Sequence, residues 1–456
     1  MAILLARIVE QKMALHPRIK PCPLAVLAIL SLGSLIGCGA GSSSGGGSPL
    51  ASSNLTFGAN IQISPLGSSV DRSVAVGDHS IAILDGSVYI VWADNKTGDY
   101  DIYLAVGSDR GRIFDPPLIV NDVTPREQRS PEVAVDLKGN LYIVWEDNRD
   151  GDAASDFDLY FTKGTKQPDG GIRFSKDILV NDDADQSNAP RDHSNPALAV
   201  DADGNVYIAW EDPRNLGPET DIFFAKGTPG SDGMITFSKS QRVNQNLAGI
   251  SDYGDPSIAV DARGGICVGW VVFNAHSQIY MAKGIEHNGE ISFQEEVKVS
   301  DDESRIPLFP SVAVDGQNNI YVVWEDLRGA KQDADIYLAK SMDGGQSFDP
   351  NINVSDAPGD QFSPSLSVDS GGRVTIAWED HRNGDADPDI YLARSTNSGD
   401  RFGVPSRVDD DTGTAAQSSP SLALDLMGHA FLIWFDERNA CVNSSCPNAL
   451  YFTVGQ

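Results

Sequence analysis

Short apolar runs alternate with polar turns along most of the chain, and residues 311–354 show the pattern in full. Runs rich in β-branched, aromatic and other apolar residues occupy 312–314, 320–324, 335–339 and 351–354. Turns rich in Gly, Asp and Asn separate them. Such runs bounded by such turns are typical of strands. The stretch therefore predicts a four-stranded antiparallel meander.

The same unit recurs seven times, and each copy holds one tryptophan near the end of its second run. These residues are Trp92, Trp145, Trp210, Trp270, Trp324, Trp378 and Trp434. The second run, for example 320–324, is apolar at successive positions, so both faces of its sheet need to be covered. Repeating units that each contain four strands stack radially, so that neighbouring sheets cover one another's faces. The pattern predicts an all-β fold, a seven-bladed β-propeller of four-stranded antiparallel blades.

The order of the runs indicates how the ring closes. An aromatic residue precedes a polar residue by seven positions in the fourth run of each unit, and Phe57 and Ser64 form the first such pair. This run precedes every other strand, whereas the last unit ends at its third run, 450–452. We expect the N-terminal strand to complete the last blade, which removes an unpaired seam.

Variable loops lie at one face of the predicted ring. The spacing from a proline to the tryptophan is constant in six units, but the spacing from the tryptophan to the third run varies. Loops between second and third strands share a face with the connections between blades, and we call this the loop face. Loops on a rigid scaffold commonly carry binding, so we expect a ligand there.

The N-terminal segment has the features of an export signal. Arg18 and Lys20 precede an apolar run at 24–36, which is short for a spanning helix. Residues 35–38, Leu-Ile-Gly-Cys, resemble a bacterial lipobox. We predict a signal peptide at 1–37, lipidation of Cys38, a Gly/Ser tether at 38–53 and the propeller at 54–456. An uncleaved anchor is the alternative. The expected location is a bacterial outer membrane or cell surface.

The net charge excludes some classes of binding partner, and the cysteines indicate a possible disulfide. The formal net charge is -30, which argues against nucleic acid and anionic lipid surfaces as partners. Cys441 and Cys446 flank a short loop and form a plausible disulfide in an exported protein. The sequence predicts that Cys267 is a buried strand residue. We expect a monomer.

One turn carries a recognisable motif. Residues 341–348, Ser-Met-Asp-Gly-Gly-Gln-Ser-Phe, resemble the Asp box of bacterial neuraminidase repeats. We expect Asp343 to cap backbone N–H groups and glycine to take a positive φ, with Ser341, Gly345 and Phe348 as the other structural members. The resemblance implies a sialidase-like β-propeller, but it says little about activity, because these boxes are structural in that family.

The sialidase resemblance also implies an arginine triad, a tyrosine activated by glutamate and an aspartate acid/base. Five arginines follow the tryptophans at equivalent positions: Arg149, Arg214, Arg328, Arg382 and Arg438. We expect each to pair with the aspartate two residues earlier, and the alternative is a role in binding at the loop face. Tyr253 lies outside the repeated tyrosine positions and is the candidate nucleophile if the protein is an enzyme.

Two loops are dense in carboxylates, which are the hard oxygen ligands that calcium prefers. They make Asp150, Asp152, Asp385 and Asp387 candidate calcium ligands, although a solvated acidic rim is the alternative. No other cofactor is expected. The fourth unit replaces the charged segment after its tryptophan with residues 271–276, which we interpret as either a ligand notch or plain divergence.

These observations favour a surface propeller that binds a glycan or a protein partner without catalysis. One alternative is a sialidase-like exo-glycoside hydrolase. A second alternative is a structural surface scaffold.

Overall fold

The computed structural model describes residues 55–65, 70, 79–96, 98–122, 126–149, 156–183, 192–214, 220–245, 252–273, 277–302, 306–328, 333–395, 397–438 and 449–456. The predicted signal peptide, Cys38 and its tether lie outside these residues, as do Cys441, Cys446, Asp150 and Asp152. Within them, no helix has the length and apolar character needed to cross a membrane.

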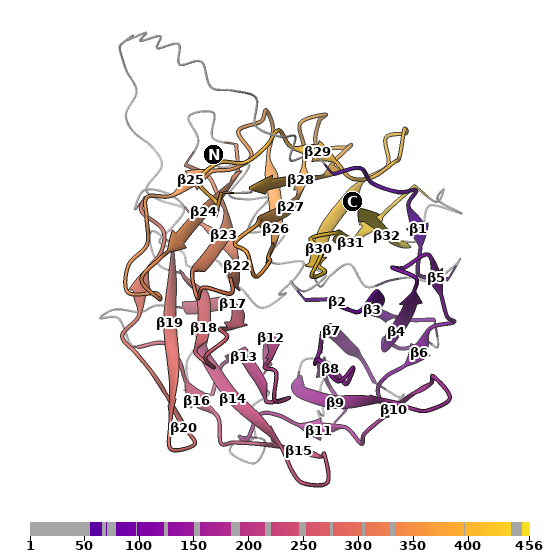
Figure 1. Ribbon diagram of the computed structural model, residues 1–456, viewed down its shortest axis with the longest axis vertical. Coiled ribbons are helices and arrows are strands. Elements are labelled where there is room, and N and C mark those ends of the chain that lie inside the picture. Colours follow the sequence, from indigo (N-terminus) through magenta and orange to yellow (C-terminus); the bar gives the residue numbers. More distant parts are fainter. Residues whose placement is uncertain are drawn as a thin grey trace. The chain divides into compact units, whose positions relative to one another are not determined.

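Seven antiparallel sheets follow one another around a ring, which confirms the predicted seven-bladed β-propeller (Figure 1). The innermost strands are β2 (Ile81–Leu84), β7 (Gln128–Val135), β12 (Ser194–Val200), β17 (Asp252–Val260), β22 (Leu308–Val314), β26 (Gln361–Val368) and β30 (Gln417–Leu424). Each contacts the next along the chain, and β30 contacts β2. We number the blades 1 to 7 in this order.

Each inner strand pairs with a second strand, which pairs with a third. The second strands are β3 (Ser87–Asp94), β8 (Leu141–Asp147), β13 (Val206–Asp212), β18 (Ile266–Phe273), β23 (Ile320–Asp326), β27 (Val374–Asp380) and β31 (Ala430–Asp436). The third strands are β4 (Asp101–Ser108), β9 (Asp158–Lys166), β14 (Asp221–Pro229), β19 (Gln278–His287), β24 (Asp335–Ser341), β28 (Asp389–Ser395) and β32 (Ala449–Gly455).

The outer edge of blades 1 to 4 consists of two short strands, and that of blades 5 to 7 of one. The pairs are β5 (Ile113–Phe114) and β6 (Leu118–Ile119), β10 (Ile172–Phe174) and β11 (Ile178–Leu179), β15 (Ile235–Phe237) and β16 (Gln241–Arg242), and β20 (Glu290–Phe293) and β21 (Val297–Lys298). The single strands are β25 (Ile352–Asn353), β29 (Ser406–Arg407) and, in blade 7, β1 (Ile61–Gln62).

The N-terminal strand closes the ring as the sequence predicts. β1 pairs with β32, with Ile61 opposite Phe452 and Gln62 opposite Tyr451. Figure 1 shows β1 beside β32 although one lies near the start of the chain and the other at its end. Every blade therefore has a fourth strand, and blade 7 has no open edge on that side.

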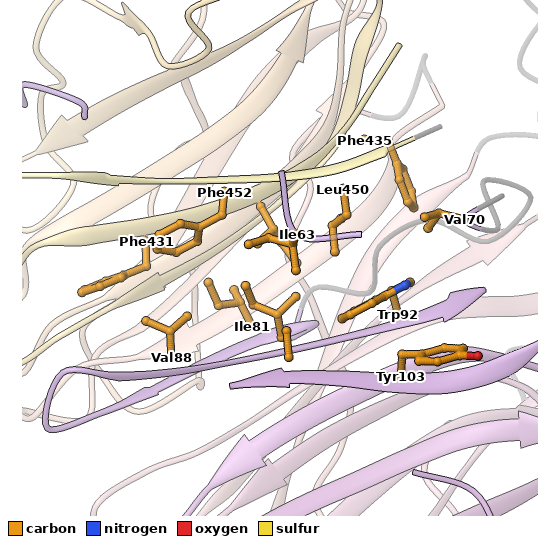
Figure 2. Close-up of a cluster of buried hydrophobic side chains, with 13 residues drawn as sticks. Ile63, Val70, Ile81, Val88, Trp92, Tyr103, Phe431, Phe435, Leu450 and Phe452 are labelled. Atoms are coloured by element: carbon orange, nitrogen blue, oxygen red, sulfur yellow. The ribbon is translucent and has the colours of Figure 1, made fainter. Parts of the chain in front are cut away.

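Apolar side chains fill the space between neighbouring blades. The six tryptophans from Trp145 onward have no exposed surface, and Trp92 is 3% exposed. Between blades 7 and 1, Ile63 and Phe452 face Val88 and Trp92 (Figure 2). The closing interface thus contains the same kind of core as the other interfaces, and burial of this apolar surface stabilises the closed ring.

A bulge before a proline marks six of the seven inner strands. The residue that precedes the proline has a φ between 50° and 52°, which non-glycine residues adopt uncommonly. These residues are Ser130, Asn195, Asp255, Phe309, Ser363 and Ser419. The pairing register with the second strand shifts at each one.

A glutamate from the preceding blade binds the bulge in four places. Each glutamate directly follows a tryptophan, and its carboxylate accepts the backbone N–H of the bulge residue. The pairs are Asn195 with Glu146 (2.9 Å), Asp255 with Glu211 (2.7 Å), Ser363 with Glu325 (3.0 Å) and Ser419 with Glu379 (3.3 Å). These buried glutamates therefore hold neighbouring blades together.

Candidate functional site

The five repeated arginines of the loop face all bind aspartate. In each, a terminal guanidinium nitrogen lies 2.6–2.7 Å from Oδ2 of the aspartate two residues earlier. The same oxygen accepts the indole N–H of the tryptophan in these blades. This is the pairing that the sequence predicts, and it places the arginines in the framework. Whether they also bind a ligand stays a prediction.

Four of these arginines also bind an aspartate from the connection that enters their blade. Arg149 reaches Asp122 at 2.8 Å and Arg214 reaches Asp182 at 3.1 Å. The other two pairs are Arg328 with Asp301 and Arg438 with Asp410. Since each such aspartate belongs to the end of the preceding unit, these ion pairs bridge successive blades at the rim.

Blade 3 breaks the repeat at a buried position on this face. Three residues before the proline of the inner strand, blades 2, 6 and 7 carry Gln128, Gln361 and Gln417, whereas blade 3 carries His193. All four side chains are almost fully buried, and His193 is 2% exposed. A titratable ring thus replaces a neutral amide in blade 3.

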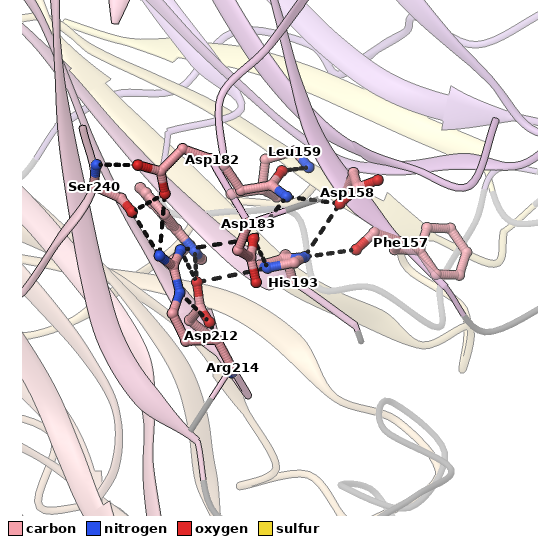
Figure 3. Close-up of polar contacts among 11 residues, drawn as sticks. Phe157, Asp158, Leu159, Asp182, Asp183, His193, Asp212, Arg214 and Ser240 are labelled. Carbon is pink, nitrogen blue, oxygen red and sulfur yellow. Dashed lines mark hydrogen bonds and ion pairs between the residues drawn. The ribbon is translucent and has the colours of Figure 1, made fainter. Parts of the chain in front are cut away.

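Carboxylates from two blades surround the imidazole of His193 (Figure 3). Nε2 lies 3.0 Å from Oδ1 of Asp183 and 3.6 Å from Oδ2 of Asp212. Nδ1 lies 3.4 Å from Oδ1 of Asp158 and 3.2 Å from the carbonyl oxygen of Phe157. Asp158 begins β9 in blade 2 and Asp212 ends β13 in blade 3, so the ring bridges the two blades.

The surroundings keep the imidazole protonated. Burial alone would lower the pKa of His193, but Asp158, Asp183 and Asp212 raise it to about 10. Burial raises and His193 lowers the pKa of Asp183, and the net result is a pKa far below the ordinary value. At neutral pH the pair is a buried imidazolium–carboxylate ion pair, which is costly to break from one side.

The donor set of this cluster suits the imidazolium better than a metal ion. One ligand atom each from Asp183, His193 and Asp212 lies within 4.8 Å of the others, which is close enough to consider a metal. However, Oδ2 of Asp212 already accepts the N–H of Trp210 at 2.8 Å and a guanidinium N–H of Arg214 at 2.6 Å. A divalent ion there would lie beside a fixed positive charge.

Tyr253 takes the position of His193 in blade 4. It is 3% exposed, and its hydroxyl donates to the backbone carbonyl of Gln245 at 3.1 Å. A backbone carbonyl orients the phenol but is a poor base for activating it as a nucleophile. The candidate nucleophile therefore lies in a structural setting, and its catalytic role stays untested.

The turn at 341–348 has the geometry that its motif predicts. Oδ1 of Asp343 accepts the backbone N–H groups of Gln346 (2.9 Å) and Ser347 (3.0 Å), and Ser341 Oγ accepts that of Gly345 (2.8 Å). Gly345 has a φ of 95°. The hydrogen bond from Ser347 is the largest of the effects that lower the pKa of Asp343, to about 2. This turn lies on the face opposite the loops, which we call the turn face.

The candidate calcium ligands that the structure describes are Asp385, which is exposed, and Asp387, which is half-buried. Neither belongs to the one acidic and histidine group, among the described residues, whose ligand atoms converge. Calcium binding there stays a prediction. Sequence reasoning missed His193, although comparing the residue three positions before each proline would have found it.

The fold defines this protein as a seven-bladed β-propeller whose loop face carries an inter-blade network of aspartate, arginine and one buried histidine. No protein-family profile matches the sequence, and a search of curated proteins finds no match. Solved structures do match, at the level of fold.

Three solved structures illustrate the likeness. An ulvan lyase of polysaccharide lyase family PL25, bound to a GlcA–Rha3S saccharide, aligns with a TM-score of 0.58 and 12% identity over 84% of this chain and 93% of that chain. A protein of unknown function from Dyadobacter fermentans aligns with a TM-score of 0.51 and 11% identity over 88% and 99%. A Hadza microbial sialidase aligns with a TM-score of 0.46 and 12% identity over 78% and 73%. At these identities the likeness shows the fold alone, and the sialidase score supports no argument.

Proposed function

We propose that the protein is an exported, lipid-anchored propeller that binds a glycan or a protein partner on its loop face and does not catalyse a reaction on it. This proposal rests on the way in which the five loop-face arginines are bound. Each is bound by the aspartate two residues earlier, in a geometry that repeats from blade to blade. A triad that binds one carboxylate needs three arginines aimed at the same point, and repeat-equivalent arginines point to different places around a ring.

A glycan is the first class of ligand to test. The solved propellers that this chain resembles in fold include a lyase whose structure contains a saccharide. A rigid ring with variable loops at one face is also a suitable scaffold for recognition. The anchor proposed from residues 35–38 and the Gly/Ser tether would present the ring at the bacterial surface, where glycans are accessible. We expect it to act there as a monomer.

Arg382 is the loop-face arginine best placed to contact a ligand. Its side chain is 23% exposed, against 10–18% for the other four. It binds Asp380 through Nε and one terminal nitrogen, at 2.8 Å and 2.6 Å. Within the described residues its other terminal nitrogen makes no hydrogen bond, so it could donate to a ligand oxygen.

A glycan array probed with residues 54–456 tests the proposal. We expect binding to a defined set of glycans without their cleavage, and weaker binding by Arg382→Gln. Lys138→Gln, on an exposed turn at the turn face, is the matched control and should bind normally. Cleavage of a bound glycan would contradict the non-catalytic proposal, and equal binding by both variants would contradict the loop-face site.

A further inference from the structure

An open groove of ≈ 520 Å³ lies between blades 4 and 5 on the turn face. Its lining includes Asp261, Arg263, Lys283, Glu286, Asn318 and Met342. These residues come from the turns of β17–β18 and β22–β23, from β19 and from the turn after β24. The groove is therefore on the face opposite the loops, and it is independent of the function proposed above.

In blades 2, 3 and 5, two side chains fill the space beside the equivalent turn. The turn aspartate accepts hydrogen bonds from an asparagine four residues later and a tyrosine six residues later. In blade 2, Asp136 Oδ2 accepts from Asn140 (2.7 Å) and Tyr142 (2.9 Å). The same pairs recur at Asp201 in blade 3 and at Asp315 in blade 5. The tyrosine rings lie between their own blade and the next.

Blade 4 has lost both side chains. Gly265 replaces the asparagine and Cys267 replaces the tyrosine. Lys283 compensates, because its Nζ lies 3.0 Å from Oδ2 of Asp261 and 3.4 Å from the carbonyl oxygen of Gly344. The equivalent Lys163 of blade 2 instead lies over the ring of Tyr142, 5.7 Å from its centre.

Blade 5 has changed at the matching position across the groove. The residue that faces the tyrosine of the preceding blade is Gly204 in blade 3 and Gly372 in blade 6. Blade 5 carries Asn318 there, with a φ of 64°. Its Oδ1 is buried without a hydrogen-bond partner among the described residues, and an unsatisfied buried acceptor is costly. The residue itself is half-buried and lines the groove, so a turn of its amide towards the groove would let a donor from a bound molecule satisfy this oxygen.

We propose that this groove binds a neutral, polyhydroxylated molecule of monosaccharide or disaccharide size. Hydroxyl groups both donate and accept, so they can bind Asn318 Oδ1 and the exposed Arg263 together. Three carboxylates (Asp261, Glu286 and Asp343) and three cations (Lys226, Arg263 and Lys283) lie in or beside the groove, and this balance favours a neutral molecule over an ion. The groove volume is in the range of small-molecule sites.

Apolar contacts at the rim complete the fit. Met342 is 56% exposed and Ile285 is half-buried, and both line the groove. The C–H faces of a sugar ring can pack on such side chains while its hydroxyls reach the polar groups. Three changes from the repeat, Gly265, Cys267 and Asn318, meet at this one boundary, which is why we assign the site here.

The test titrates maltose, cellobiose, lactose and chitobiose into the full chain, solubilised in a detergent without a sugar head group. Saturation-transfer NMR and calorimetry would report binding. We expect at least one probe to bind with a Kd on the order of 1 mM. The double variant Cys267→Tyr/Asn318→Gly rebuilds the pair seen at Tyr142 and Gly204 and fills the groove. It should weaken that binding about tenfold or more, which corresponds to about 1.4 kcal/mol.

Controls separate this site from folding and from the loop face. Asn318→Gly alone removes the unpartnered acceptor without filling the groove, and it should weaken binding severalfold while thermal melting stays cooperative. Arg382→Gln should leave the binding of the sugar unchanged. No binding of any probe at about 20 mM, or undiminished binding in the double variant, would overturn the proposal. If the double variant does not fold, the single variant Asn318→Gly tests the proposal. Full binding by this variant, which lacks the acceptor, would also overturn the proposal.

Discussion

Asn60 and Asp410 exchange two hydrogen bonds although 350 residues separate them in the chain. The backbone N–H of Asn60 donates to Oδ2 of Asp410 at 3.0 Å, and the backbone N–H of Asp410 donates to Oδ1 of Asn60 at 2.7 Å. Arg438 binds both side chains. Asn351 and Asp301 make the equivalent reciprocal pair between blades 4 and 5. The N-terminal segment thus reproduces an inter-blade contact of the repeat.

Removal of this segment should destabilise the whole ring. Deletion of residues 54–66 removes β1, Asn60 and the buried Ile63, and exposes the edge of β32. We expect the free energy of unfolding to fall by more than about 4 kcal/mol, since large buried side chains are lost together with strand pairing. Chemical denaturation measures this. A deletion of equal length in the tether, residues 40–52, is the control, and equal melting of the two proteins would refute the pairing.

The buried histidine should give a pH-dependent stability difference. The pKa of His193 rises from 6.5 to about 10 on folding, so its contribution is fully present below about pH 6.5 and declines as pH rises towards 10. His193→Gln introduces the residue of blades 2, 6 and 7 but leaves Asp183 without its cation. We expect a loss of about 3 kcal/mol at pH 6, shrinking by pH 10.

Urea unfolding of both proteins at pH 6, 8 and 10 measures that difference. His287→Gln is the matched control, because His287 is exposed on the turn face. A difference for His193→Gln that is the same at all three pH values would show that folding does not raise the pKa of His193.

Asp177, unlike His193, should destabilise the folded protein at neutral pH. Burial and its contact with Asp122 raise the pKa of Asp177 to about 7, although Arg149 opposes the shift. The folded state therefore favours the protonated acid, and the contribution of Asp177 to stability declines as pH rises from about 4 to 7. Asp177→Asn, which has the amide found at Asn351 and Asn60, should be about 1 kcal/mol more stable at pH 7.5 and equal at pH 4. A less stable variant at pH 7.5 would mean that the contact of Asp177 with Arg149 dominates.

The proposed anchor depends on Cys38. Cys38→Ala should abolish lipidation, so that the protein is released from membranes or accumulates with its signal attached. Detergent partitioning and the mass of the N-terminal peptide measure the two outcomes. Ser42→Ala, in the tether, is the control. Normal maturation and membrane partitioning of Cys38→Ala would refute the lipoprotein prediction.

The protein should not hydrolyse sialosides. Purified residues 54–456 should release no fluorescent product from an aryl sialoside above background, because the loop-face arginines and Tyr253 are held in framework contacts. Turnover that disappears in Tyr253→Phe would instead support the hydrolase alternative. Tyr280→Phe, at a tyrosine position shared by other third strands, is the control for non-specific damage.

Local relationships were predictable from the sequence, and relationships across blades mostly were not. The pairing of Arg328 with Asp326 follows from a separation of two residues in a repeated motif. The environment of His193 does not, because Asp158 lies 35 residues before it and Asp212 lies 19 residues after it, on different strands. The groove at Asn318 escaped notice for the same reason, since it depends on Cys267 in the neighbouring blade.

The pairing of β1 with β32 also sets the order in which the molecule can be completed. β1 is synthesised before every other strand, and its partner is the last strand of the chain. A nascent chain that ends before residue 449 can form blades 1 to 6, but it holds an open ring whose apolar cluster at the seam is half assembled. Such a surface is prone to association with other chains. The final step of folding therefore waits until residues 449–455 have been made, and under the export proposed above that step would take place on the far side of the membrane.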